Sequence, residues 1–218
     1  MFRDRLAKVT DFLLTQQENL EKNERAYKLQ GAEMTRAHLQ SFLDGSLAGK
    51  VNVQQGLNLL YWQTVDDLNR MANERPDVFR EALTQLWNLP GDLKRADAFW
   101  SALDSALEVL PAEQRQHFNG FGTRASVVSY FLFLTDPTGH PFYRPNFAGR
   151  AVEWLYDKRD GLDRRSLGSF LTDFVGRCRY LHREFSDARV PLRDMLDMQG
   201  ALYIISTQYL PDARRRKK

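Results

Sequence analysis

The residues best suited to bind an anion lie near the middle of the chain, where two glycines flank an aromatic residue in Gly120-Phe121-Gly122. Glycine tolerates a positive φ angle and lets another group approach the backbone closely. An apolar helical pattern follows over residues 123–134, and the first N–H groups of such a helix have no partner within it. Because these amides and the helix dipole favour negative charge, the spacing predicts a phosphate site at this helix start, with Thr123 and Arg124 beside it.

The same three residues, followed by Ala125, resemble the hairpin of the helix-hairpin-helix DNA-binding motif. In that motif Gly-hydrophobic-Gly joins two helices and a small residue follows one turn later. The resemblance implies that the backbone amides of Gly120 and Gly122 hold a DNA phosphate. The pattern is short, and an ordinary tight turn between two helices explains it equally well.

Arginines suited to phosphate contacts follow this stretch. Arg144 and Arg150 flank the turn at Pro145, and Tyr143 places an aromatic ring beside them. Long basic side chains near free amides are the groups that hold a nucleic-acid backbone. Further basic residues follow, namely Lys158, Arg159, Arg164, Arg165, Arg177, Arg179 and Arg183. The alternative is a solvated, salt-bridged surface, because acidic residues are interleaved with them, namely Glu153, Asp157, Asp160 and Asp163.

Residues for catalysis or metal binding are sparse. The chain has no Gly-rich loop that ends in Lys-Ser or Lys-Thr, so no nucleotide site is expected. Cys178 is the only cysteine, which excludes an internal disulfide and a cysteine metal cluster. Four histidines are scattered without metal-ligand spacing, namely His38, His117, His140 and His182. We therefore expect a protein that is not an enzyme and that binds no metal and no cofactor.

The net charge of +3 comes from the C-terminus. The last five residues, Arg214-Arg215-Arg216-Lys217-Lys218, are all basic, and without them the net charge would be −2. A basic footprint over the whole surface, which nucleic-acid binders often have, is therefore absent. DNA contact must rest on local clusters or on the tail, where Arg214, Arg215 and Arg216 would add attraction without sequence preference. We expect residues 211–218 to form a disordered basic tail.

Amphipathic helical patterns account for almost the whole chain, and no alternating strand pattern persists. The sequence predicts an all-α, multi-helix globular fold of about nine helices with a helix-hairpin-helix-like element. The expected helices cover residues 2–28, 32–47, 53–72, a segment from 76, 93–110, 123–134, 146–156, 163–184 and 195–209. We divide the chain into an N-terminal helical region at 1–92, a helix-hairpin-helix-like region at 93–210 and the tail.

The first expected helix carries a seven-residue repeat of Leu6, Leu13, Leu20 and Tyr27, and Gly31 is expected to end it. This helix either packs on its own domain or pairs with a second helix, in a homodimer or a partner protein. No signal peptide and no apolar run long enough to cross a bilayer are visible, so a cytoplasmic protein without membrane contact is expected.

A family resemblance rests on three motifs in order. They are Gly-Phe-Gly-Thr-Arg-Ala-Ser-Val-Val-Ser at 120–129, Asp136-Pro137 with Pro-Phe-Tyr-Arg-Pro at 141–145, and Asp-Met-Leu-Asp-Met-Gln at 194–199. Over residues 99–206 the chain resembles a helical region found next to the ATPase domains of McrB-type restriction systems. The resemblance implies a module of a prokaryotic restriction or anti-phage defence system, with other subunits such as an AAA ATPase or a nuclease as partners.

The same stretch is distantly similar to helix-hairpin-helix DNA glycosylases. Arg124 stands where those enzymes have a lysine, and the segment at 141–145 has no aspartate in the catalytic place, so base excision is not expected. We therefore expect a non-catalytic DNA-binding or target-sensing module. The alternative is a protein–protein interaction adaptor of a defence complex, which the near-neutral body and the seven-residue repeat favour.

Overall fold

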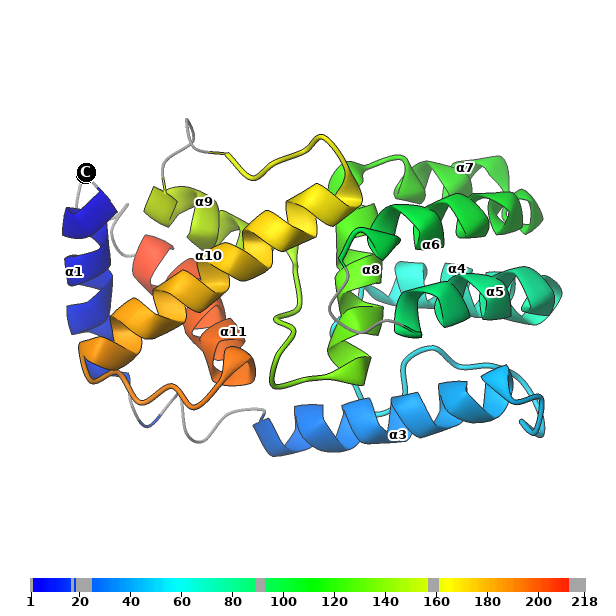
Figure 1. Cartoon of the computed structure of the whole chain (residues 1–218), viewed down its shortest axis with the longest axis horizontal. Helices are drawn as coiled ribbons and strands as arrows, with labels where there is room; N and C mark the ends of the chain where they lie inside the picture. Colours follow the sequence, from blue (N-terminus) through cyan, green and yellow to red (C-terminus); the bar gives the residue numbers. More distant parts are fainter. Residues whose placement is uncertain (1, 17, 19–24, 89–92, 157–160, 212–218) are drawn as a thin grey trace.

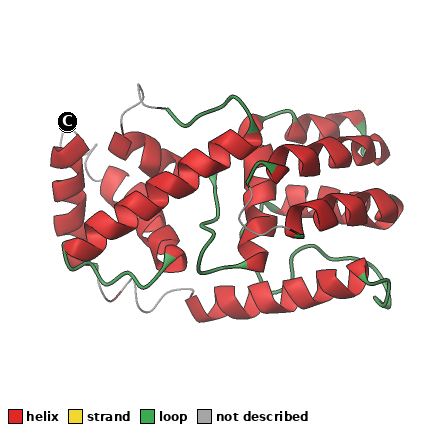
Figure 2. Cartoon of the chain, in the orientation of Figure 1, coloured by secondary structure: helices red, strands yellow, loops and turns green. Residues whose placement is uncertain are grey.

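The computed structural model describes residues 2–16, 18, 25–88, 93–156 and 161–211, and every regular element within them is helical (Figure 2). The all-α prediction is confirmed. The α-helices are α1 (Phe2–Leu14), α3 (Arg25–Leu43), α4 (Trp62–Glu74), α5 (Pro76–Trp87), α6 (Arg95–Asp104), α7 (Ala112–Arg115), α8 (Phe121–Thr135), α9 (Arg150–Tyr156), α10 (Leu167–Asp187) and α11 (Met195–Ile204). Two π-helical turns, η3 (Pro145–Gly149) and η5 (Ile205–Tyr209), continue into or out of these helices. Two 3₁₀ turns, η1 (Ser105–Val109) and η2 (Gln116–Phe118), lie before and after α7.

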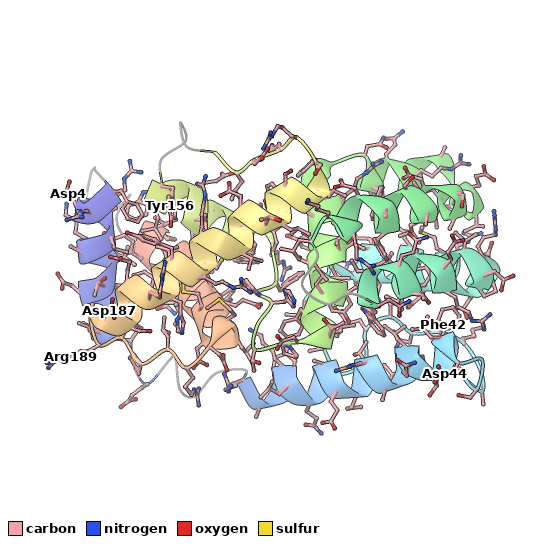
Figure 3. The ribbon with its side chains drawn as sticks, in the orientation of Figure 1. Asp4, Phe42, Asp44, Tyr156, Asp187 and Arg189 are labelled. Atoms are coloured by element: carbon pink, nitrogen blue, oxygen red, sulfur yellow. The ribbon has the colours of Figure 1, made fainter. Side chains whose placement is uncertain are left out.

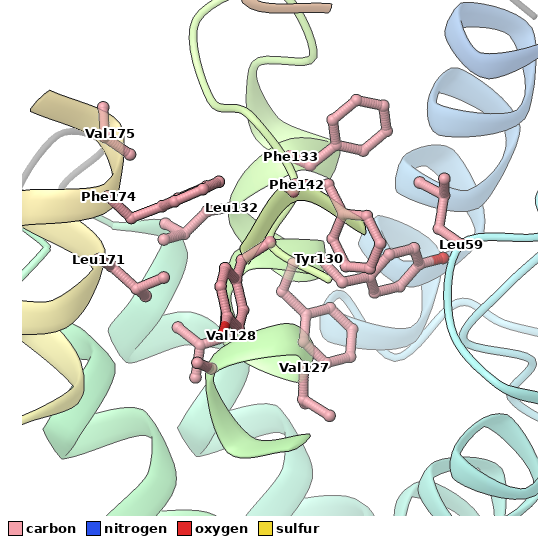
Figure 4. Close-up of a cluster of buried hydrophobic side chains, with 14 of the residues drawn as sticks. Leu59, Val127, Val128, Tyr130, Leu132, Phe133, Phe142, Leu171, Phe174 and Val175 are labelled. Atoms are coloured by element: carbon pink, nitrogen blue, oxygen red, sulfur yellow. The ribbon is translucent and has the colours of Figure 1, made fainter. Parts of the chain in front are cut away.

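Helix α8 stands at the centre of the molecule (Figure 1). It packs against α3, α5, α6 and α10. Its residues 125–134 are all buried, because its sequence is apolar on every side rather than on one stripe. Figure 4 shows its side chains, among them Val128, Tyr130 and Phe133, pointing in different directions into the core. The sequence placed this helix at 123–134, and the prediction is confirmed to within two residues.

One hydrophobic cluster includes buried side chains from both predicted regions, from Leu6 in α1 to Leu210 after η5. The boundary predicted between residues 92 and 93 adjoins residues 89–92, which lie outside the described part of the chain. The basic tail, 211–218, lies outside it too, except for Pro211. Charged side chains labelled in Figure 3, such as Asp44, Asp187 and Arg189, lie at the periphery.

The single helix predicted over residues 2–28 is wrong. Helix α1 ends at Leu14, and the backbone N–H groups of Thr15 and Gln16 each donate to the carbonyl three residues earlier, which closes the helix. Gly31 does not end a helix but lies buried inside α3. A Cβ at Gly31 would lie 2.7 Å from the carbonyl oxygen of Gly56, so the glycine allows α3 to press against the following loop.

The helix predicted over 53–72 begins only at Trp62. Residues 51–60 form a loop whose polar groups are bound by side chains instead of by a helix. Asn73 exchanges two hydrogen bonds with the backbone of Val51, and Asn69 Oδ1 accepts from the N–H of Val53. The Tyr130 hydroxyl of α8 donates to the carbonyl of Val53 at 2.7 Å. These bonds satisfy backbone groups that would otherwise be buried and unpaired.

Candidate nucleic-acid interface

The three sequence motifs lie against one another in the structure. The loop after α8 turns back beside that helix (Figure 1), so that Pro145 lies on Gly122, where an added Cβ would come 3.0 Å from Pro145 Cγ. The backbone N–H of Phe142 donates to Gln199 Oε1 at 3.1 Å. Segments 120–129, 136–145 and 194–199 are therefore one contiguous piece of the fold.

The start of α8 differs from the predicted hairpin in its backbone geometry. Gly120 is the N-cap with φ −74°, and Phe121 and Gly122 already belong to the helix. Neither glycine uses the positive φ that glycine allows, because the glycines with positive φ among the described residues are Gly45, Gly49 and Gly56. The N–H groups of Thr123 and Arg124 both donate to the carbonyl of Gly120, which leaves the amides of Phe121 and Gly122 without a partner in the described part of the chain.

Arg124 is held inside the fold. Its Nε donates to the carbonyl of Phe118 at 2.7 Å, its guanidinium lies 5.1 Å from the centre of the Trp100 ring, and Asp104 lies 3.7 Å from its terminal nitrogen. Gly122 and Arg124 are two residues apart on a helix, which places them about 200° apart around its axis. The structure therefore brings Arg144 close to Gly122 and leaves Arg124 on the opposite side of α8.

The other predicted site residues are spread over several environments. The ring of Phe121 packs edge-on against Phe170, with ring centres 5.1 Å apart. Thr123 is half-buried next to Gly120. Arg150 is half-buried at the junction of η3 and α9, and it forms no ion pair with any described residue. Arg214, Arg215 and Arg216 lie outside the described residues.

A row of aromatic and arginine side chains lies where the start of α4, the turn η3 and helix α11 meet. The guanidinium carbon of Arg144 is 4.5 Å from the centre of the Tyr61 ring and 4.8 Å from that of Phe147. The ring centres of Phe147 and Tyr203 are 5.1 Å apart. We call this set, together with Trp62 because it follows Tyr61 directly in the chain, the aromatic–arginine face, and its members are Tyr61, Trp62, Arg144, Phe147 and Tyr203.

Three members of this face are unusually exposed for large aromatic side chains. Trp62 is 68% exposed, Tyr61 is 48% exposed and Tyr203 is 45% exposed. Large aromatic side chains of a soluble domain normally bury most of their surface. Exposed rings gathered at one place are a mark of a binding surface.

The backbone of the face is firmly anchored. The N–H of Tyr143 donates to Ser129 Oγ on α8 at 3.0 Å, directly before Arg144. Asn146 Nδ2 donates to the Tyr61 hydroxyl at 3.1 Å, and Ser206 Oγ donates to the carbonyl of Asn146 at 3.0 Å. The two π-helical turns are thus tied to each other and to the start of α4. The turn that carries Arg144 and Phe147, and the Tyr61 ring, are held in place before any ligand arrives.

Arg144 is the charged centre of this face. It forms no ion pair with a carboxylate of the described residues, and its Nε is buried without a hydrogen-bond partner. A buried donor without a partner is costly, and an arginine packed against two rings keeps its charge and its remaining N–H groups for an anion. Of the predicted arginines, Arg144 is therefore the one that the geometry leaves best placed to bind.

The sequence did not single out Tyr61, Trp62 or Tyr203. The helix predicted over residues 53–72 includes Tyr61, which lies directly before α4 as its N-cap. Two adjacent aromatic residues followed by Gln63 cannot both face the core of one helix. This pattern was the available sign that at least one of the two rings is exposed. The meeting of residues 61, 144 and 203 depends on tertiary packing alone.

A second polar cluster joins α3 to α11. Arg25 donates to both oxygens of Asp194 at 2.9 and 2.6 Å and to Asp197 at 3.0 Å, and Arg193 donates to Asp197 at 2.7 Å. Asp194 also caps α11 by accepting from the N–H groups of Leu196 and Asp197. Burial opposes the ionisation of both carboxylates, but the hydrogen bonds from Arg25 and Arg193 leave the pKa of Asp194 and of Asp197 below the ordinary value. The cluster is saturated with internal bonds and offers no free ligand group.

A buried carboxylate lies between α4 and η2. Burial raises the pKa of Asp67, and the His117 hydrogen bond, with Nδ1 3.2 Å from Asp67 Oδ2, acts against this shift. No group of three or more histidine, cysteine or acidic residues that could hold a metal ion occurs in the described residues. The pair alone is a structural contact between two elements.

No protein-family model, no curated protein and no solved structure matches this chain. Among the described helices, none is both long and apolar enough to span a bilayer.

Proposed function

We propose that this protein is a non-catalytic DNA-binding module and that the aromatic–arginine face is its contact surface. The observation that carries the proposal is the position of Arg144, whose guanidinium lies over two rings without a carboxylate partner among the described residues. A guanidinium is a planar fork of donors that matches the oxygens of a phosphate. Because the rings already hold this fork, less conformational entropy is lost when an anion binds.

Two further groups support an anionic ligand, one close to Arg144 in the chain and one in contact with Pro145. Arg150 lies six residues after Arg144 and has no ion-pair partner in the described part of the chain. The unpaired amides of Phe121 and Gly122 begin α8, and Pro145 lies directly on Gly122. The guanidinium of Arg150 and the amides of Phe121 and Gly122 are therefore donors that a phosphate could use.

The net charge of the chain limits the electrostatic part of the DNA affinity. The body lacks a broad basic surface, so few phosphates are neutralised and the affinity depends on local contacts. The slope of log affinity against log salt is expected to be small, at about 0.9 for each phosphate contact on duplex DNA and about 0.7 on a single strand. The resemblance of residues 99–206 to regions beside McrB-type ATPases supports a role as a target-sensing subunit of a prokaryotic defence complex, with an ATPase or a nuclease as partner.

The test compares Arg144→Gln with Arg183→Gln in fluorescence anisotropy titrations of labelled DNA over a range of salt. Arg183 is the matched control, because its guanidinium lies 5.9 Å from the Tyr180 ring but outside this face. Arg144→Gln is expected to weaken binding about tenfold or more and to lower the salt slope by about one contact. Equal effects of both variants, or none, would contradict the proposal.

A second candidate function is a protein-interaction adaptor. Tryptophan, tyrosine and arginine are the residue types that dominate hot spots of protein interfaces, and the face contains all three. The near-neutral body is also compatible with a protein ligand. Binding to a partner subunit that is insensitive to salt and is lost in Trp62→Ala would favour this candidate.

A further inference from the structure

We infer that the aromatic–arginine face takes unpaired bases of a DNA single strand rather than the outside of a duplex. The inference rests on the proposed function, and it adds the class of ligand. It starts from the observation that the most exposed groups of the face are flat rings and not charges, led by Trp62 at 68% exposed. A surface that held only the phosphates of a duplex would need donors at those positions.

The chemistry of the two ligands decides between them. In a duplex the faces of the bases are stacked inside, and a protein meets phosphates, sugars and base edges. An exposed ring can stack only on a base that is unpaired and turned outward. Trp62 has no ring or cation partner among the described residues, so its indole is available for such a stack.

The order of groups along the face fits a strand that alternates bases and phosphates. The Arg144 guanidinium lies close to the rings of both Tyr61 and Phe147, and Tyr203 lies next to Phe147. A cation is therefore in contact with a group of rings of which Tyr61 and Tyr203 are exposed, and the exposed Trp62 follows Tyr61 in the chain. Single-strand binding surfaces combine these two elements, a positive group for the backbone and rings for the bases.

Charge complementarity selects a nucleic acid over an uncharged ligand. Arg144 and Arg150 both lack a carboxylate partner within the described residues, so each guanidinium keeps its charge for an anionic ligand although the body of the chain is not basic. A strand that is held partly by stacking needs fewer phosphate contacts than a duplex that is held by charge alone. This explains how a chain without a broad basic surface can bind DNA.

The experiment uses the full chain and one labelled DNA strand of about 12 nucleotides, a length within the range that single-strand sites cover. The strand is presented alone, as a duplex with its complement, and as RNA of the same sequence. The variants are Trp62→Ala, Trp62→Phe and Arg144→Gln, with Tyr180→Ala as the control, because Tyr180 is 37% exposed and lies outside this face. The melting temperature of each variant is measured alongside.

The single strand is expected to bind more tightly than the duplex, and Trp62→Ala to weaken it about five- to a hundred-fold without changing the salt slope. Trp62→Phe retains part of the affinity, and Arg144→Gln lowers the slope by about 0.7. RNA that binds as tightly as DNA would widen the ligand class to any single strand. Binding of the duplex at least as tight as the single strand, with Trp62→Ala neutral, would overturn this inference and leave the proposed function standing. If neither DNA form binds at low salt, both fall, and a partner protein becomes the occupant of the face.

Discussion

Gly122 and Pro145 lie so close together that a Cβ on the glycine would come 3.0 Å from Pro145 Cγ. The contact joins the first turn of the buried helix α8 to the turn that carries Arg144 and Phe147. Gly122 is needed for space and not for an unusual backbone angle, since it lies within α8 and is not among the glycines with positive φ.

Gly122→Val is expected to lower the free energy of unfolding by about 1–3 kcal/mol, because the larger side chain overpacks against Pro145. Gly176→Ala is the control, since Gly176 lies in α10 with nothing within 4 Å of an added Cβ. It is expected to stabilise by about 0.5–1 kcal/mol through helix propensity. Urea denaturation measures both, and a Gly122→Val protein as stable as the wild type would refute the steric role.

Arg124→Ala is expected to reduce stability by about 1–2 kcal/mol, since it removes the hydrogen bond to the carbonyl of Phe118 and the contact with Trp100. DNA affinity, measured well below the melting temperature, is expected to stay unchanged. The opposite result, full stability with a lower salt slope, would return Arg124 to the binding surface.

Arg25→Ala is expected to destabilise by about 2–4 kcal/mol at neutral pH, because it leaves Asp194 and Asp197 with fewer partners in a partly buried place. The pKa of each carboxylate lies below its ordinary value of 3.8 in the folded protein, so their contribution is present above that value and is lost as the pH falls through the folded pKa. The difference between wild type and variant should therefore shrink below about pH 4. Arg165→Ala, which removes the exposed pair with Asp163, serves as the control and should change little. A difference that is constant with pH would argue against the ion pairs.

Asp67→Asn is expected to remove a pH dependence of stability whose sign is opposite to that of Asp194 and Asp197. Burial raises the pKa of Asp67 above its ordinary value of 3.8. Its favourable contribution is therefore complete below that value and is lost as the pH rises through the raised pKa. The melting temperature of the wild type should fall relative to that of Asp67→Asn as the pH is raised from about 4 to about 7. Parallel curves would mean that the carboxylate has an ordinary pKa.

Deletion of Arg214 to Lys218 is expected to weaken DNA binding and to lower its salt slope, because five adjacent positive charges attract any nucleic acid. The deletion should weaken single strand and duplex alike, unlike Trp62→Ala. Unchanged binding would show that the tail makes no contact with DNA.

The central helix could be predicted from sequence because its local sequence pattern indicates burial on every side. Residues 125–134 are apolar or small almost without interruption, and Asp136-Pro137 marks the end. The loop at 51–60 could not be predicted, because its backbone is held by Asn69 and Asn73, which lie 16 to 22 residues away from their partners. The spacing of its leucines matched a helix, and those leucines are buried without being helical.

The candidate site was predicted only in part. Arg144 was found from its place after the helix and before Pro145, and Phe147 follows three residues later, whereas Tyr61 and Tyr203 come from segments about 60 to 85 residues away in the chain. The sequence could not show that Arg124 and Arg144 lie on different sides of α8, because adjacency along the sequence does not reveal which side of a helix a neighbouring turn will cover.

The π-helical turns have an evolutionary consequence. Each of η3 and η5 accommodates one residue more than an α-helical turn, and both border the aromatic–arginine face. Loss of a single residue from η3 in a related lineage would convert it to ordinary helix while α9 stayed fixed in the core. The segment directly before η3 would then have to take up the lost residue, because α8 and α9 are both buried in the core. Such a one-residue deletion would move Arg144 relative to Tyr61 and change the shape of the surface without altering any residue of the core.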